Sequence, residues 1–188
     1  MFRSHRSARI AVLVGLTFAA AASRLVPHPH NFAPIGALAL FGGATYASTR
    51  AAFLVPLAAM FLSDLGIGLV SGDMALGLHA LMPVVYGSFL LIVCLGFVLR
   101  RRRRIGPIAV TTVAASLLFF VLTNLGNWAL LDAYPPTWEG LVACYVAALP
   151  YLGNTMLGDA AYGIALFGGM ALLERGVPAL REVEPVAV

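Results

Sequence analysis

Two carboxylates inside apolar segments are the residues in this sequence best suited to chemistry. Asp64 lies within the run "AFLVPLAAMFLSDLGIG", and Asp159 lies within "YLGNTMLGDAAYGIALFGG". An ionised carboxylate that faces lipid is unfavourable by roughly 2.5–3.5 kcal/mol, so such a residue normally faces a cavity or a partner. Each Asp therefore has two interpretations: it lines a binding cavity, or it caps a neighbouring helix or pairs with Arg24 for structural reasons alone.

A short polar loop adds two imidazoles and an amide. In "RLVPHPHNFAP", His28, His30 and Asn31 separate two apolar runs. The prolines stiffen the loop, so it could hold these side chains over a cavity at a low cost in ordering entropy. A His-x-His pair without a third ligand at fixed spacing is a poor metal motif. We therefore expect a lid over a binding site, with no metal and no cofactor.

The composition identifies the class of protein. The chain is 61% hydrophobic and 11% charged, with a mean hydropathy of +0.92. That leaves too little polar surface to cover a soluble domain, and an integral membrane protein is indicated. The net charge of +4 does not indicate nucleic-acid binding, because five arginines form the run Arg100–Arg104 with no interleaved aromatics. We expect this run to bind anionic lipid.

The lengths of the apolar runs predict an all-α fold, a polytopic membrane protein with one transmembrane domain over residues 1–188. A helix needs roughly 20 residues to cross a bilayer. The last run is too long for one crossing, and Pro150 and Gly153 suggest a break in it. Six spans are expected, at about residues 8–25, 33–46, 51–70, 79–99, 107–125 and 150–173, with a short interfacial helix at about 138–149.

The arginines predict the orientation. With the N-terminus inside, eleven of the twelve arginines fall on the cytoplasmic side, and only Arg24 falls outside. The positive-inside rule then places both termini in the cytoplasm, in a bacterial cytoplasmic (inner) membrane. The first apolar run also has the features of a cleavable signal peptide. A ladder of small residues, Ala11, Gly15 and Ala19, favours a retained helix that a partner helix can approach closely.

This topology brings polar residues from separate spans into one layer. Those within the spans lie roughly 5–14 Å below the outer boundary, counted at 1.5 Å per residue. We therefore expect a single solvated chamber in the outer half of the bundle. The candidate binding residues are His28, His30, Asn31, Asp64, Tyr86, Asn124, Asn127, Trp128, Asn154 and Asp159.

Two resemblances bear on function. The strings "RLVPHPHNFAPIGALALFGGATY" and "FFVLTNLGNWAL" resemble a bacterial family of membrane proteins of unknown function that are described as transporters, over roughly residues 20 to 170. Size and six-helix plan are more distantly similar to the substrate-binding S components of energy-coupling factor (ECF) transporters. That second resemblance implies an outward-open pocket, contact of the Ala11, Gly15 and Ala19 surface with a membrane coupling subunit, and separate ATPases. The start Met1-Phe2-Arg3 lacks the N-terminal histidines of the metal-type S components, which argues against nickel or cobalt uptake.

We expect a transport protein that binds a vitamin-like solute. By the topology, the outer half holds five acidic residues against Arg24, a field that favours a neutral or cationic solute; they are Asp64, Asp73, Asp132, Glu139 and Asp159. The sequence contains no nucleophile motif and no phosphate-binding loop, so we do not expect an enzyme. Two alternatives stay open: an assembly subunit without a ligand, and an intramembrane enzyme that uses the two Asp residues.

Overall fold

Every described element of the chain is a helix. The computed structural model describes residues 2–101 and 103–181, and no strand occurs in this part of the chain. The helices are α1 (Phe2–Ala22), α2 (Ile35–Thr45), α3 (Thr49–Ser71), α4 (Met74–Gly77), α5 (Met82–Gly96), α6 (Ile105–Leu130), α7 (Trp138–Gly163) and α8 (Gly169–Gly176). Short turns extend them: η1 (Ser23–Leu25), η2 (Phe97–Arg100), the π-helical η3 (Ile164–Gly168) and η4 (Pro178–Leu180).

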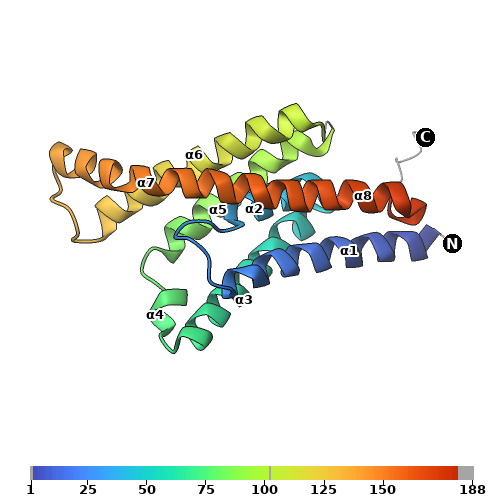
Figure 1. Cartoon of the computed structure of the whole chain (residues 1–188), viewed down its shortest axis with the longest axis horizontal. Coiled ribbons are helices and arrows are strands. Elements are labelled where there is room, and N and C mark those ends of the chain that lie inside the picture. Colours follow the sequence, from blue (N-terminus) through green and yellow to red (C-terminus); the bar gives the residue numbers. More distant parts are fainter. Residues whose placement is uncertain (1, 102, 182–188) are drawn as a thin grey trace.

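The helices form a bundle with two distinct ends. The start of α1 and the end of α8 lie at one end, which we call the termini end (Figure 1). The α6–α7 connection and α4 lie toward the opposite end, which we call the loop end (Figure 1). In the described chain, five helical segments are long and apolar enough to cross a membrane, and α2 is a shorter apolar helix. The all-helical architecture is confirmed, and it is compatible with a multi-pass membrane protein.

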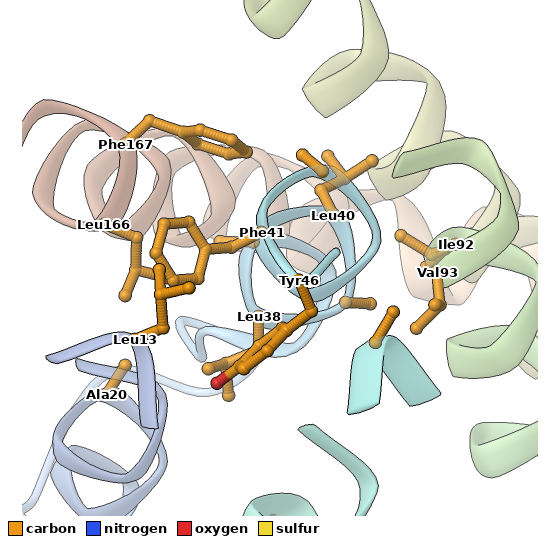
Figure 2. Close-up of a cluster of buried hydrophobic side chains, with 14 of the residues drawn as sticks. Leu13, Ala20, Leu38, Leu40, Phe41, Tyr46, Ile92, Val93, Leu166 and Phe167 are labelled. Atoms are coloured by element: carbon orange, nitrogen blue, oxygen red, sulfur yellow. The ribbon is translucent and has the colours of Figure 1, made fainter. Parts of the chain in front are cut away.

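The short helix α2 forms the centre of the bundle. Ten of its 11 residues are buried, and it packs against α1, α3, α5, α6 and α7. Figure 2 shows Phe41 pointing from α2 toward Leu13 and Leu166. The ring of Phe167 meets the ring of Phe41 edge-on at 5.3 Å between centroids. A helix surrounded in this way has no polar face, which is why its sequence "IGALALFGGAT" is apolar throughout.

Glycines let α2 and α5 approach closely. A Cβ on Gly43 would lie 2.1 Å from the carbonyl oxygen of Val93, and one on Gly96 would lie 2.6 Å from that of Leu40. Both distances are far below van der Waals contact, so only a residue without a side chain fits there. The Gly42-Gly43 pair in α2 is therefore a packing feature.

The expected break at Pro150 is wrong. The helix continues from Trp138 through Pro150 to Gly163 and, by way of η3 and α8, to Gly176. This 39-residue segment is about 58 Å long at 1.5 Å per residue, so the separate interfacial helix at 138–149 does not exist. Proline removes one helical hydrogen bond, to the carbonyl four residues earlier. Pro150 and Val146 both lie on the exposed face of the helix, and membrane helices tolerate proline where neighbouring groups satisfy the freed carbonyl.

Each of the other five expected segments overlaps one helix, with different bounds. The largest departures are α1, which begins at Phe2 instead of 8, and α6, which extends to Leu130 instead of 125. The α2 helix begins at Ile35 instead of 33, after the non-helical residues 26–34, of which 26–31 are exposed and Pro34 is buried.

Candidate functional site

Asp159 caps the central helix. Its Oδ1 accepts a hydrogen bond from the backbone N–H of Ala37 at 3.0 Å, and its Oδ2 accepts one from the hydroxyl of Ser116 at 2.7 Å. Helix N-termini carry unpaired N–H groups and partial positive charge, both of which a carboxylate satisfies. Residue Pro34 at the N-cap position of α2 makes no side-chain cap bond. The cap therefore comes from α7, which is 122 residues away along the chain.

Small residues make this cap possible. A Cβ on Gly36 would lie 2.4 Å from Oδ2 of Asp159, and a Cβ on Gly158 would lie 3.0 Å from the backbone nitrogen of Ala33. Asp159 itself is only 1% exposed. The first turn of α2 thus sits directly on α7, and its amides reach the carboxylate.

Asp64 belongs to a different network. Its Oδ1 pairs with Nη1 of Arg24 at 2.7 Å, and its Oδ2 accepts a hydrogen bond from the hydroxyl of Tyr86 at 2.6 Å. The same Arg24 nitrogen donates to the hydroxyl of Ser63. This network joins η1, α3 and α5. A buried carboxylate with a cationic partner and a hydroxyl donor meets the requirement that a desolvated charge be paired.

A cavity of about 190 Å³ lies beside the first turn of α2. Its apolar wall includes Ile35, Ile67 and Phe119. Five polar residues from three parts of the chain complete the lining: Arg24, His28, Asn31, Thr155 and Asp159. The cavity thus combines an apolar wall with a few convergent polar groups, as small-molecule sites do.

The two carboxylates do not share this cavity. Asp159 lines it, whereas Asp64 does not, and Arg24 is the residue that belongs both to the lining and to the Asp64 network. The expected single chamber with both carboxylates in its wall is therefore corrected to one cavity plus an adjacent ion pair. Depth along a helix is similar for the two residues, but the angle around each helix separates them.

The loop that covers the cavity is fixed at several points. Phe32 donates its backbone N–H to the carbonyl of Pro29 at 3.0 Å, and Asn31 adopts a left-handed backbone with φ of 61°. Asn154 of α7 donates its side-chain amide to the carbonyl of His30 at 2.9 Å. Asn tolerates left-handed φ better than most residues do. The loop therefore holds His28 and Asn31 at the cavity, while the His30 side chain does not line it.

The other predicted site residues serve helix contacts instead of lining the cavity. Asn124 donates to the carbonyl of Phe120 in its own helix. Asn127 reaches the sulfur of Cys144 at 3.7 Å. Trp128 donates from Nε1 to the carbonyl of Pro135 at 2.9 Å. None of the three, and not Tyr86, belongs to the cavity lining.

Sequence reasoning missed several residues that line the cavity or hold its carboxylate. Arg24 offered a signal, because it is the only arginine expected on the outer side. Ser116 and Thr155 offered none, since hydroxyl residues in apolar helices usually bond to their own backbone. Thr155 does so, to the carbonyl of Tyr151 at 3.1 Å.

The small-residue ladder faces outward. Ala11, Gly15 and Ala19 are all exposed on α1, and a Cβ on Gly15 would meet nothing within 4 Å. The helix itself is fixed in the bundle, because Arg9 pairs with Glu174 of α8. The ladder therefore takes no part in packing within the described chain.

The arginine run divides between two roles. Arg100 points inward and donates from Nε and Nη2 to the carbonyls of Gly43 and Tyr46 at 2.9 and 3.1 Å, so two of its nitrogens are engaged within the chain. Arg101 and Arg104 are exposed, whereas Arg103 is half-buried. Arg102 lies outside the described residues. Among those residues, no group of three or more His, Cys, Asp or Glu side chains could hold a metal ion.

The sequence model of a family of unknown function, DUF6580, matches residues 4–180. The chain belongs to this family. No curated protein and no solved structure matches the chain.

Proposed function

We propose that this member of the DUF6580 family binds a small solute in the cavity at the start of α2 and helps to move it across the bacterial inner membrane. The proposal includes six spans with both termini in the cytoplasm. It also includes a role like that of an ECF S component, a binding subunit that other subunits power.

The observation that carries the proposal is a cavity at the N-terminus of a half-length central helix. The α2 helix has 11 residues, about 16 Å of rise, roughly half of a ~30 Å hydrocarbon core. Non-helical residues 26–34 precede it, and in our proposal they complete the crossing. Non-helical backbone at membrane depth is tolerated where protein buries it or where it lines a water-filled cavity. Transporters use interrupted helices in this way to build binding sites near the bilayer midplane.

The size of the cavity restricts the solute. A volume of about 190 Å³ would hold roughly six water molecules at ~30 Å³ each. Sites for drug-sized ligands are larger, on the order of 300–1,000 Å³. The solute is therefore compact, on the scale of a vitamin precursor, with an apolar portion for Ile67 and Phe119.

The distribution of arginines supports cytoplasmic termini. Arg9, Arg100 and Arg181 all bond to residues at the termini end. Arg24 instead lies at the cavity beneath the 26–34 loop. An excess of arginine marks cytoplasmic segments, so the loop end and the cavity mouth face outward. In this orientation the exposed Arg101 and Arg104 meet anionic lipid of the inner leaflet.

The outward-facing ladder on α1 supports a membrane partner. Small side chains on an exposed helix face let another helix approach closely. A coupling subunit on Ala11, Gly15 and Ala19, with ATPases bound to that subunit, would supply the energy that this chain lacks motifs to obtain. The same ladder also favours the second candidate, an assembly subunit without a solute.

Mass spectrometry of the purified protein tests the proposal. We expect a small molecule to remain bound after mild detergent extraction, and to be lost in Thr155→Phe, which fills the cavity. The matched control is Leu157→Phe on the same helix, because Leu157 is 63% exposed and does not line the cavity. A stable partner protein with no bound small molecule would favour the assembly subunit instead.

An intramembrane enzyme that uses the two Asp residues has little support. The carboxylates have separate partners, Arg24 and Tyr86 for Asp64, and Ser116 and α2 for Asp159. Paired acid–base work requires two groups that reach one substrate.

A further inference from the structure

We infer that the transported solute carries an oxyanion, in the simplest case a carboxylate, which binds the free edge of the Arg24 guanidinium. The inference rests on the proposed function and deepens it, because it names the chemical class of the solute. It also departs from the neutral or cationic solute that the count of acidic residues favours.

All hydrogen bonds and the ion pair of the Arg24 side chain with the described residues are made by one nitrogen, Nη1. Nη1 bonds to Asp64 and Ser63 and approaches the carbonyl and sulfur of Met60. Within the described chain, Nε and Nη2 have no hydrogen-bond or ion-pair partner. Neither atom is sealed in the interior, and the residue lines the cavity.

Nε and Nη2 form one edge of the planar guanidinium. Two parallel N–H donors on such an edge match the two oxygens of a carboxylate. Asp64 and Ser63 hold the opposite side of the group, and Tyr86 in turn holds Asp64. The fork is therefore fixed before the solute arrives, which reduces the ordering cost of binding.

The charges around the cavity are compatible with an anionic group. Asp73, Asp132 and Glu139, three of the acids behind the opposite expectation, do not line it. Asp159 does, but its oxygens are engaged by Ser116 and the first turn of α2, and the helix dipole offsets its charge. Asp64 neutralises Arg24 without occupying its second edge. The unpartnered donors of Arg24 then decide what the cavity binds.

Three small probes of nearly equal size test the charge preference. Acetate, acetamide and ethylammonium are titrated onto the purified full-length protein in detergent at constant ionic strength, and binding is followed by saturation-transfer NMR. We expect acetate to bind about tenfold more tightly than acetamide, the difference expected for charge-assisted hydrogen bonds. Ethylammonium should bind most weakly.

Two variants link this preference to the cavity and to the fork. Thr155→Phe should abolish acetate binding, while Leu157→Phe should leave it unchanged. Arg24→Lys keeps a charge for Asp64 but lacks the planar fork, so it should lower the acetate preference at least fivefold while the protein stays folded. Retained acetate binding in Thr155→Phe would overturn the inference.

The failures of the two proposals are distinguishable. If acetamide or ethylammonium binds in the cavity better than acetate, the oxyanion inference is wrong and the solute-binding proposal survives. If no probe binds in a way that Thr155→Phe abolishes, and no molecule co-purifies, the proposed function fails and the inference fails with it.

Discussion

Asp159 and Arg100 bond to opposite ends of the same short helix. Asp159 accepts the N–H of Ala37 at the start of α2, and Arg100 donates to the carbonyls of Gly43 and Tyr46 at its end. An anion at the N-terminus and a cation at the C-terminus both complement the helix dipole. An isolated helix of 11 residues is shorter than the roughly 12–15 residues needed for marginal stability in water. Most of its stability comes from packing against five other helices, and these two distant side chains add to that packing in fixing the position of α2 and one wall of the cavity.

Removing the N-terminal cap should destabilise the protein. Asp159→Ala leaves the buried N–H of Ala37 without its acceptor, at a cost of about 1–3 kcal/mol, while the hydroxyl of Ser116 keeps the carbonyl of Thr112 at 3.2 Å as an acceptor. Asp159→Asn keeps one acceptor oxygen and should lose less. The check is the thermal unfolding midpoint of the purified protein in detergent. Ser116→Ala is the control for the second bond, and a larger loss in Ser116→Ala than in Asp159→Ala would contradict the capping role.

Removing the C-terminal cap should have a smaller effect in the same direction. Arg100→Gln loses donors to two carbonyl groups and a favourable dipole interaction, which we expect to lower the free energy of unfolding by roughly 1–2 kcal/mol. Arg101→Gln is the matched control, because Arg101 is exposed next to it in the sequence. Both changes remove one positive charge from the same turn. Equal melting temperatures for the two variants would show that the contacts of Arg100 contribute nothing.

Replacing each of three glycines with alanine should distinguish glycines required by close packing from a glycine that only lowers helix propensity. Gly36→Ala places a methyl group 2.4 Å from the Asp159 carboxylate, and Gly43→Ala places one 2.1 Å from the carbonyl oxygen of Val93. Each should cost at least about 1–3 kcal/mol through overpacking. Gly15→Ala meets no neighbouring atom and should instead stabilise α1 by up to ~1 kcal/mol. In fluorescence-detected gel filtration, Gly15→Ala should give the highest folded yield, and Gly36→Ala and Gly43→Ala should both give less.

The global architecture was predictable because it depends on local quantities. Long apolar runs and few charges are enough to predict an all-helical membrane-type bundle. The continuity of the helix through Pro150 was not predictable in the same way, since the cost of a proline depends on how the carbonyl that it leaves free, that of Val146, is satisfied. The surroundings of that carbonyl are set by the neighbours of α7, which one sequence does not reveal.

The candidate site shows the same limit in its two carboxylates. The sequence indicated that Asp64 and Asp159 need partners, and it offered Arg24 pairing and helix capping as alternatives to a cavity. It could not choose, because depth along a helix leaves the angle around the axis undetermined. The structure gives Asp64 the ion pair, and gives Asp159 both the cap and a place on the cavity.

For the Arg24–Asp64 pair, we expect the loss of one partner to destabilise the protein more than the loss of both. From the sequence alone, Asp64→Asn would be expected to weaken uptake without reducing the amount of folded protein. The structure predicts otherwise, because that change leaves Arg24, 11% exposed, without its carboxylate. Breaking a buried pair by removing one partner costs about 3–5 kcal/mol, whereas replacing both with apolar residues is often much milder.

Asp64→Leu should therefore unfold at a clearly lower temperature than Arg24→Met/Asp64→Leu, although the double variant carries more changes. Tyr86→Phe, which removes one hydrogen bond to Asp64, should lose only about 1 kcal/mol. Thermal unfolding of Asp64→Leu, Arg24→Met and the double variant gives the coupling energy between Arg24 and Asp64 from a double-mutant cycle, and Tyr86→Phe is measured beside them. Additive losses would mean that Arg24 and Asp64 stabilise the fold independently, and that Asp64 does not hold the guanidinium in place at the cavity.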